Sequence, residues 1–297
     1  MGALDFTRTE RALISRPGGL LVHRLTRKAL KAVHRAIGSL LPADALTMTF
    51  PEVPGRIHVN DLMLRSSAPK DVAHYRSDAL SGLENLEGSL RIANRSWSDV
   101  RSLLDFPSGY GRLTRWLTTK VGRELITAGD VDHQAVRFCA TEFGVKPLYA
   151  TRNIRAQVFS DTYDLIFVGS LLTHLTPSAC CDILAALIAV MRPRGQIMFT
   201  TQGETCLMHL DWYGDHFKQA ASLYRQQIAE RGIGFVPYPR SKDYGITIQP
   251  RSYVETLMRT HFPGLTLVRA QERGWDNHQD VWPYYLMESR ETASPSK

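Results

Sequence analysis

The spacing of hydrophobic positions changes near residue 100. Before that point, apolar residues recur every three or four positions, first between Leu20 and Leu41 and again over residues 60–97, as in amphipathic helices. From Val100 onward, short apolar runs alternate with helical stripes, which predicts a mostly parallel sheet with helices on both faces. We therefore expect a helical N-terminal extension (1–97), an α/β domain (98–290) and a flexible tail (291–297).

The apolar runs also predict where individual elements lie. Strands are expected at 100–106, 125–129, 147–150, 164–169, 196–201, 246–249, 265–271 and 281–287. Helices are expected at 217–231 and 250–261, and a Pro- and Gly-rich loop at 50–55.

Most of the net charge of +7 belongs to the N-terminal segment. Residues 1–42 carry eight Lys and Arg against Asp5 and Glu10, which leaves +6 there and +1 elsewhere. The helix expected at 20–41 is therefore basic on one face, and three arrangements fit it: packing on its own domain, a homodimer contact, or peripheral contact with an anionic membrane. Its shallow, alanine-rich apolar face favours packing on protein. The balanced charge elsewhere predicts no nucleic-acid partner.

Other features of composition limit the classes of protein. No run of about 18 uncharged apolar residues is present, and no signal-peptide pattern is found, so a cytoplasmic location is expected. The four cysteines show no zinc-ligand spacing, and we expect no metal site.

The stretch from Leu103 to Arg112 turns from an apolar strand, through two glycines, into a helix. Gly109 and Gly111 allow the backbone N–H groups of such a turn to approach a nucleotide-like ligand closely. A dinucleotide-binding turn needs a third glycine where this chain has Thr114, which counts against NAD and FAD. Asp105, at the strand end, would repel a pyrophosphate but could accept a hydrogen bond from an ammonium group.

An acidic residue follows the second strand, about 20 positions after the glycine turn, where an acid can bind ribose hydroxyls. Asp130 is the candidate, and its neighbour Asp132 is the alternative. Either residue could instead cap the next helix, which is a common role of aspartate.

These residues resemble the binding motif of class I S-adenosylmethionine (SAM)-dependent methyltransferases, Asp-x-Gly-x-Gly-x-Gly, with Pro107 in place of the first glycine. A second block, Tyr163 to Leu175, followed by Arg192-Pro193-Arg194-Gly195, resembles the fourth strand of that family and its turn into the fifth. The resemblance covers about residues 100–203. It implies a Rossmann-like α/β fold, with a mostly parallel seven-stranded sheet, and SAM as cofactor.

The resemblance also implies which residues hold SAM. The cofactor-binding candidates are Asp105, Pro107, Ser108, Gly109, Gly111, Asp130, Val131, Gly169, Ser170 and Leu171. Asp105 and Gly109 would face the methionine moiety, Asp130 the ribose, and Gly169 to Leu171 the methyl group.

Three residues are candidates for the catalytic chemistry. His174, just past the fourth strand, could act as a general base, or it could simply pack against the following helix. His278 and Asp280, in a polar loop between the last two strands, could contact the methyl acceptor, or the loop could be a solvated turn. Residues His209, Asp211, Tyr213 and Tyr244 belong to an insertion that usually shapes the acceptor pocket in this family.

The sequence therefore predicts a SAM-dependent methyltransferase that acts on a small molecule. It contains no Asn/Asp-Pro-Pro-Tyr/Trp motif of the kind used to methylate amino groups of bases, and this favours a small-molecule or sugar-type hydroxyl as acceptor. The alternative is a non-catalytic SAM-binding protein that regulates a partner.

Overall fold

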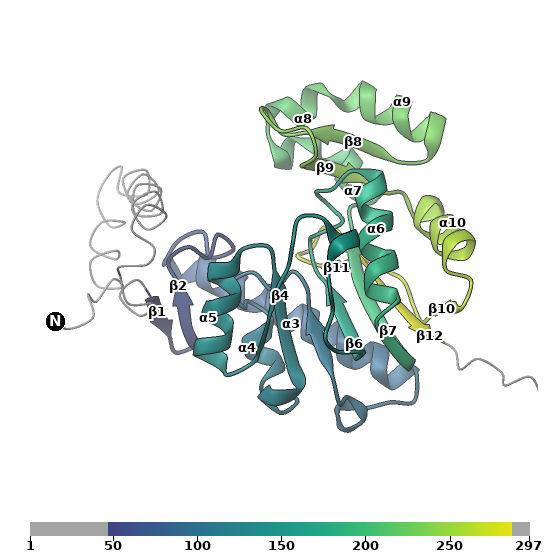
Figure 1. The fold of residues 1–297 in the computed structure, drawn as a ribbon. Helices are drawn as coiled ribbons and strands as arrows, with labels where there is room; N and C mark the ends of the chain where they lie inside the picture. The colour runs from purple at the N-terminus through teal and green to yellow at the C-terminus, as the bar shows by residue number, and fades with distance from the viewer. Residues whose placement is uncertain (1–46, 287–297) are drawn as a thin grey trace, which may run out of the picture. The chain divides into compact units, whose positions relative to one another are not determined.

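The computed structural model describes residues 47–286 (Figure 1). These residues form two compact units. The first unit consists of residues 47–83 and 108–149, and the second of 84–107 and 150–286. The predicted basic helix at 20–41 and the predicted tail at 291–297 lie outside the described residues.

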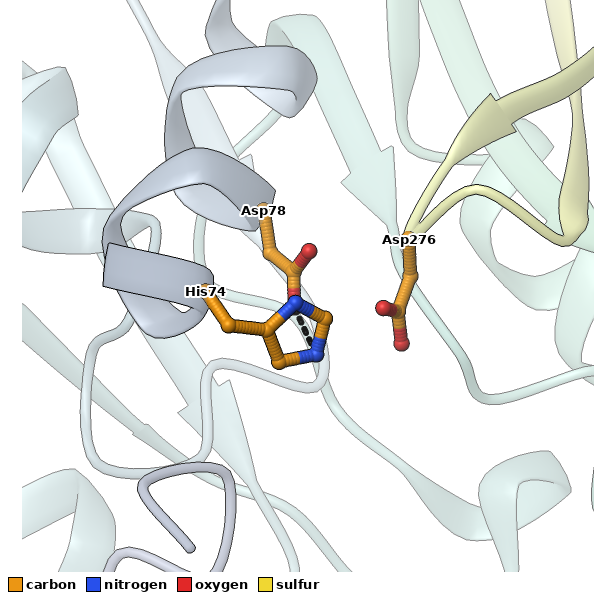
Figure 2. Close-up of side chains that lie close together, drawn as sticks. All are labelled: His74, Asp78 and Asp276. Carbon is orange, nitrogen blue, oxygen red and sulfur yellow. Dashed lines mark ion pairs between the residues drawn. The ribbon is translucent and has the colours of Figure 1, made fainter. Parts of the chain in front are cut away.

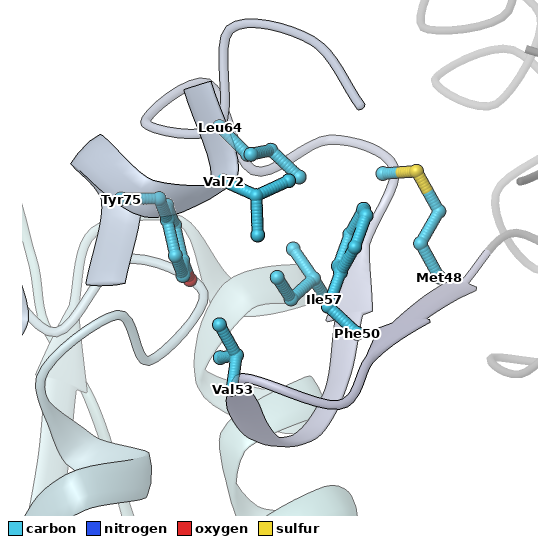
Figure 3. Packing of buried hydrophobic residues seen from close by; sticks show 7 residues of the cluster. All are labelled: Met48, Phe50, Val53, Ile57, Leu64, Val72 and Tyr75. Carbon is cyan, nitrogen blue, oxygen red and sulfur yellow. The ribbon is translucent and has the colours of Figure 1, made fainter. Parts of the chain in front are cut away.

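The first unit begins with an antiparallel hairpin, β1 (Thr47–Phe50) and β2 (Val53–His58). The loop predicted at 50–55 is therefore wrong in part, because Pro54 and Gly55 lie within β2 and only residues 51 and 52 form the turn. Helix α3 (Pro69–Ile92) follows, and its residues from Glu84 onward are counted in the second unit. The helix is shorter than the predicted 60–97. The hairpin and the start of α3 enclose a core of buried side chains (Figure 3): Met48, Phe50, Val53, Ile57, Leu64, Val72 and Tyr75.

The rest of the first unit is an α/β segment. It contains α4 (Thr114–Leu117), the 3-10 turn η2 (Arg123–Leu125), β4 (Ile126–Asp130), α5 (His133–Phe143) and β5 (Lys146–Tyr149). Strands β4 and β5 are parallel, with Asp130 opposite Tyr149 at their carboxyl ends. Asp132 caps the start of α5, and Gly144 ends it in the left-handed conformation that glycine adopts without strain.

The second unit contains a mixed sheet with strand order β10-β12-β7-β6-β3. Strands β3 (Leu103–Asp105), β6 (Tyr163–Val168) and β7 (Met191–Thr201) are parallel, whereas β12 (Gln279–Leu286) is antiparallel to β7. The predicted strand at 265–271 is in fact two short strands, β10 (Leu265–Leu267) and β11 (Gln271–Trp275), which pair with different parts of β12. The remaining elements outside the insertion are η1 (Trp97–Asp99), η3 (Ile154–Ala156) and α6 (Pro177–Ile188).

Residues 204–249, which we call the cap, form an insertion with its own core. They comprise α7 (Glu204–Met208), η4 (Leu210–Tyr213), α8 (Asp215–Gln219), α9 (Ala221–Arg231), β8 (Gly234–Pro237) and β9 (Gly245–Ile248), and α10 (Arg251–His261) follows. The helix predicted at 217–231 is interrupted at Ala220, where α8 ends and α9 begins. The buried cap core contains Cys206, Leu210, Phe217, Tyr224, Val236, Ile246 and Ile248.

Backbone hydrogen bonds attach the cap to the segment that follows β6. The N–H of Gly245 donates to the carbonyl of His174, and that of Thr247 donates to Thr173, both at 2.9 Å. The predicted α/β class, with a mostly parallel sheet and flanking helices, is confirmed. None of the helices within residues 47–286 is long and apolar enough to cross a membrane.

Candidate functional site

The two glycines of the predicted turn serve different purposes. Both have positive φ, +51° at Gly109 and +80° at Gly111, in the region that glycine adopts most easily. A Cβ atom on Gly111 would lie 2.5 Å from Cε2 of Phe143, so Gly111 is required by packing within the first unit. A Cβ atom on Gly109 would meet nothing within 4 Å. The backbone at Gly109 therefore faces open space that a ligand could use.

Hydrogen bonds join the glycine turn to the end of β4. The N–H of Ser108 donates to the Gly129 carbonyl at 2.9 Å, and the N–H of Gly109 donates to Oδ2 of Asp130 at the same distance. Oδ1 of Asp130 accepts the N–H of Asp132 at 2.8 Å. Burial raises the pKa of Asp130, while these backbone hydrogen bonds act in the opposite direction. The structure thus brings three of the predicted cofactor-binding residues, Ser108, Gly109 and Asp130, together.

The two acidic residues after β4 have separate roles. Asp132 is the helix cap, because its Oδ1 accepts the N–H groups of Gln134 and Ala135 at the start of α5. Asp130 makes no capping contact and remains the candidate for a ligand. Val131, between them, follows the end of β4 and is 52% exposed.

Arg112, directly after the glycine turn, is anchored to α3. Its Nη1 lies 2.8 Å from Oδ2 of the buried Asp78. His74, one helical turn before Asp78, places Nε2 3.5 Å from the same oxygen (Figure 2). Asp276, also drawn in Figure 2, belongs to the second unit.

In the second unit, the predicted cofactor residues lie at the carboxyl ends of β3 and β6. Asp105 is buried and pairs with Phe167 across the two strands, and Pro107 follows it. Gly169 and Ser170 come directly after β6, and Leu171 is half-buried. A Cβ atom on Gly169 would lie 2.1 Å from the ring of Trp275, so this glycine is explained by packing.

Three polar side chains fix the backbone after β6. Ser170 has a φ of +54°, and its N–H donates to Oγ1 of Thr200 at 2.9 Å. Thr200 in turn donates to Oε1 of Gln279, and Nε2 of Gln279 donates to Oγ of Ser170, both at 2.6 Å. This closed triangle holds a left-handed serine in one conformation.

His174 is held by the cap. Its Nδ1 lies 2.9 Å from the carbonyl of Gly245, and its ring stacks on Tyr244 with centroids 5.2 Å apart. A carbonyl can only accept, so we assign the proton of the neutral ring to Nδ1, which leaves Nε2 as the basic nitrogen. Burial lowers the pKa of His174, and the nearby His278 lowers it further. His174 is therefore neutral near pH 7, as a general base must be.

A row of aromatic rings connects His174 to His278. Tyr238, Phe217 and Tyr213 stand between the two imidazoles, with successive centroids 6.0, 5.2, 6.4 and 6.3 Å apart. Nδ1 of His278 lies 2.6 Å from the Asp276 carbonyl, which assigns the basic nitrogen of this ring to Nε2 as well. Both histidines thus lie against the cap. The ring of His209 stacks on that of Trp212, with centroids 4.5 Å apart. Asp211 lies beside Trp212 in η4.

Asp280 lies at the carboxyl end of β7, opposite Thr201, and is 4% exposed. Its Oδ1 accepts the N–H of Arg273 at 3.0 Å. Its Oδ2 faces Gly203, where a Cβ atom would lie only 2.2 Å away. Burial raises the pKa of Asp280 to about 6. The alternative prediction, that the loop with His278 and Asp280 is a solvated turn, does not hold for Asp280, because Asp280 is buried.

Trp275 and Gln279 belong to the polar loop predicted near the acceptor, but the sequence assigned neither a role. Each contacts a predicted site residue more than a hundred positions away. Arg115, a buried arginine next to the glycine turn, was also not predicted. The only available signal was a charged residue inside the apolar stripe of Leu113, Trp116 and Leu117.

Comparisons with known proteins agree with this architecture. Residues 103–195 match the family model described as a methyltransferase domain. No curated protein matches the sequence.

Several solved structures are similar to the chain. A SAM-dependent methyltransferase from Methanosarcina mazei is 15% identical, with 63% of this chain and 93% of that chain covered and a TM-score of 0.44. One from Clostridium acetobutylicum is 12% identical, with 72% and 92% covered and a TM-score of 0.49. The N-methyltransferase NodS from Bradyrhizobium japonicum, in complex with S-adenosyl-L-homocysteine, is 15% identical, with 69% and 87% covered and a TM-score of 0.42. The methyltransferase-domain model thus matches the same part of the chain, residues 103–195, that resembles the class I SAM-dependent methyltransferases in sequence.

Proposed function

We propose that this protein transfers a methyl group from SAM to a small molecule, with a hydroxyl as the favoured acceptor group. The observation that carries the proposal is the geometry at Gly109. Its backbone has open space on the side where a Cβ atom would stand, and its N–H is fixed on the carboxylate of Asp130. The chain thus combines a glycine turn that a ligand can approach with a buried acid beside it.

The residues present in the first unit fit SAM. Asp130 accepts the N–H groups of Gly109 and Asp132, and Val131 is a further backbone partner. An ionised carboxylate has about four acceptor positions, so capacity remains for a ribose hydroxyl. Val131 offers an exposed apolar surface next to the acid, suited to a flat purine. Ser108 and Gly111 would complete this part of the cofactor site.

In the second unit, we propose that Asp105, Pro107 and the segment from Gly169 to Leu171 contact the methionine part of SAM. When bound, SAM supplies an electrophilic methyl group on a sulfonium. The contribution of the chain is to hold the acceptor atom in line with that group and to exclude water. The triangle of Ser170, Thr200 and Gln279 supports this role because it fixes the backbone beside the proposed methyl position.

His174 is the proposed general base. With Nδ1 directed at the Gly245 carbonyl, Nε2 is available to take the proton of an acceptor hydroxyl. Its lowered pKa keeps it in the neutral form that can accept a proton. His278 and Asp280 are proposed to contact the acceptor itself, and Tyr213 and Tyr244 to line its pocket.

Two measurements test the proposal. Calorimetry should show binding of S-adenosyl-L-homocysteine to the wild-type protein, and the proposal of SAM as cofactor fails if neither this product nor SAM binds. Incubation with methyl-labelled SAM and a pool of cell metabolites should transfer label to a small molecule. Binding without any transfer would instead favour the non-catalytic SAM-binding alternative.

A further inference from the structure

Arg115 is completely buried in the first unit, with 0% of its surface exposed. It lies in α4, one turn after the last glycine of the glycine turn. A buried charge is costly unless other groups compensate for it. The groups that compensate Arg115 are backbone carbonyls and aromatic rings.

The guanidinium divides its donors between two segments. Nε donates to the Gly111 carbonyl at 2.9 Å, and Nη2 donates to the Tyr110 carbonyl at 3.2 Å. Nη1 donates to the carbonyls of Pro54 and Arg56 in β2, at 2.9 and 3.0 Å. One side chain therefore joins the glycine turn to the N-terminal hairpin through four hydrogen bonds.

Aromatic rings hold this guanidinium in place. Its Cζ lies 4.9 Å from the centroid of Phe143 and 5.7 Å from that of Tyr75. Contacts with aromatic faces stabilise a cation, and more strongly where water is excluded. The ring of Phe143 is also the one that excludes a side chain at Gly111, so the same aromatic group packs against both the turn and its anchor.

A second contact between the hairpin and the turn is independent of Arg115. The ring of His58, at the end of β2, stacks on the ring of Tyr110 with centroids 4.6 Å apart and planes 13° apart. Tyr110 is the residue between the two glycines of the turn. The hairpin therefore contacts Tyr110 in two ways. His58 stacks on the Tyr110 ring, and Arg115 links the Tyr110 carbonyl to carbonyls of β2.

We propose that Arg115 is a positioning residue of the cofactor site, and that through it the hairpin of residues 47–58 sets the conformation of the glycine turn. The inference rests on the proposed function, because it concerns binding of SAM to that turn. A segment with two left-handed glycines has many conformations of similar energy. Fixing one of them before the ligand arrives removes an entropic cost from binding.

Lysine cannot replace this arrangement. A guanidinium presents five N–H donors in a planar fork, whereas an ammonium is a compact group with three. Arg115→Lys keeps the charge but cannot serve four carbonyls on two segments. Arg115→Met keeps much of the volume and removes both the charge and the donors.

The test combines binding with local hydrogen exchange. S-adenosyl-L-homocysteine binding is measured by calorimetry, at a temperature at which every variant is folded, for wild type, Arg115→Lys, Arg115→Met and Val254→Ala. Val254 is fully buried in α10 of the second unit, so its truncation controls for a general loss of stability. Hydrogen exchange is followed in peptides that contain residues 107–112.

The methionine variant should weaken binding about tenfold or more, the lysine variant about threefold, and Val254→Ala less than about twofold. Exchange in residues 107–112 should increase in both Arg115 variants and stay as in wild type in Val254→Ala. Folded Arg115 variants with wild-type affinity and wild-type exchange would overturn the inference. If Arg115→Met does not fold, Arg115→Lys alone decides. If the wild type binds neither the product nor SAM, the proposed function fails, and the exchange measurement still decides whether Arg115 holds the turn.

Discussion

The indole of Trp275 occupies the space that a side chain on Gly169 would need. A Cβ atom at Gly169 would lie 2.1 Å from both Cη2 and Cζ3 of the ring, and the ring packs edge-on against Phe167 with centroids 5.0 Å apart. Trp275 is 4% exposed, so the indole has little room to move away. A glycine after β6 is therefore required by packing within the second unit, whatever else contacts it.

Gly169→Ala should lower the thermal stability of the protein. Forcing an extra methyl group into a packed region costs about 1–3 kcal/mol, and each kcal/mol lowers Tm by about 2–4 °C in a protein of this size. The measurement is thermal unfolding followed by circular dichroism. Gly264→Ala is the control, because a Cβ atom there would meet only Cδ1 of Leu286 at an ordinary 3.9 Å. Equal Tm values for Gly169→Ala and wild type would show that the indole moves freely.

Gly109→Val should abolish binding of S-adenosyl-L-homocysteine. The branched side chain would fill the open space at the turn and would disfavour the backbone φ of +51°. Gly214→Val is the matched control: Gly214 also has positive φ, +102°, and no atom within 4 Å of its Cβ position, but it lies in the cap. A folded Gly109→Val protein that binds the product normally would exclude the glycine turn as the cofactor site.

Asp130→Ala should weaken product binding by about 1.5–3 kcal/mol, the range for hydrogen bonds to a charged group. Asp132→Ala should instead destabilise the protein by about 1 kcal/mol through loss of the α5 cap, with a smaller change in affinity. Calorimetry and thermal unfolding of both variants separate the two effects. The reverse pattern, with affinity lost only in Asp132→Ala, would transfer the ribose contact to Asp132.

His174→Gln should retain product binding and lose methyl transfer by about 100-fold or more, the usual contribution of a general base. Because burial lowers the pKa of His174 from 6.5, the neutral form persists on the acid side of that value, and activity should decline only at pH values below it. Labelled transfer to pooled metabolites across a pH series checks both expectations. His261→Gln, at the exposed end of α10, is the control. Full activity in His174→Gln would leave His174 with a packing role only.

Asp280→Asn should raise Tm at about pH 7.5 and have a smaller effect at about pH 4.5. The folded-state pKa of Asp280 is raised to about 6 from 3.8, chiefly by burial, so the folded state binds the proton more tightly than the unfolded state. Wild-type stability from this group is therefore highest below pH 3.8 and is lost as pH rises through about 6. Asparagine avoids that loss and can still accept the N–H of Arg273. A Tm difference that does not change with pH would show that Asp280 titrates normally.

The sequence pattern was sufficient to locate most strands but not the contacts between distant residues. The strand predicted at 125–129 is β4 at Ile126–Asp130, because an apolar run bounded by polar residues is a strong local signal. The hairpin of β1 and β2 was not predicted, because Pro51, Pro54 and Gly55 are residues usually found in loops. In the structure, Gly55 lies within β2 and has a positive φ there.

For the candidate site, the sequence pattern predicts the glycine turn and the acid after β4, but not the side chains that hold them in place. Gly109 and Asp130 are recognisable because they follow strands at a spacing known to bind nucleotides. Arg115 could not be found in this way. A charged residue within an apolar stripe is normally expected to point into solvent. The four acceptors of Arg115 are backbone carbonyls, which every residue has, so no residue type in the sequence marks them.

The cap is attached to the segment after β6 by main-chain hydrogen bonds, so its side chains can change while the attachment remains. The N–H groups of Gly245 and Thr247 bind the carbonyls of His174 and Thr173, and such main-chain hydrogen bonds form whatever side chains the strand carries. Rings that face His174 from the cap, such as Tyr238 and Tyr244, can therefore be exchanged without detaching β9. In directed evolution, a combinatorial library restricted to such positions would keep the main-chain attachment of the segment that carries the proposed base.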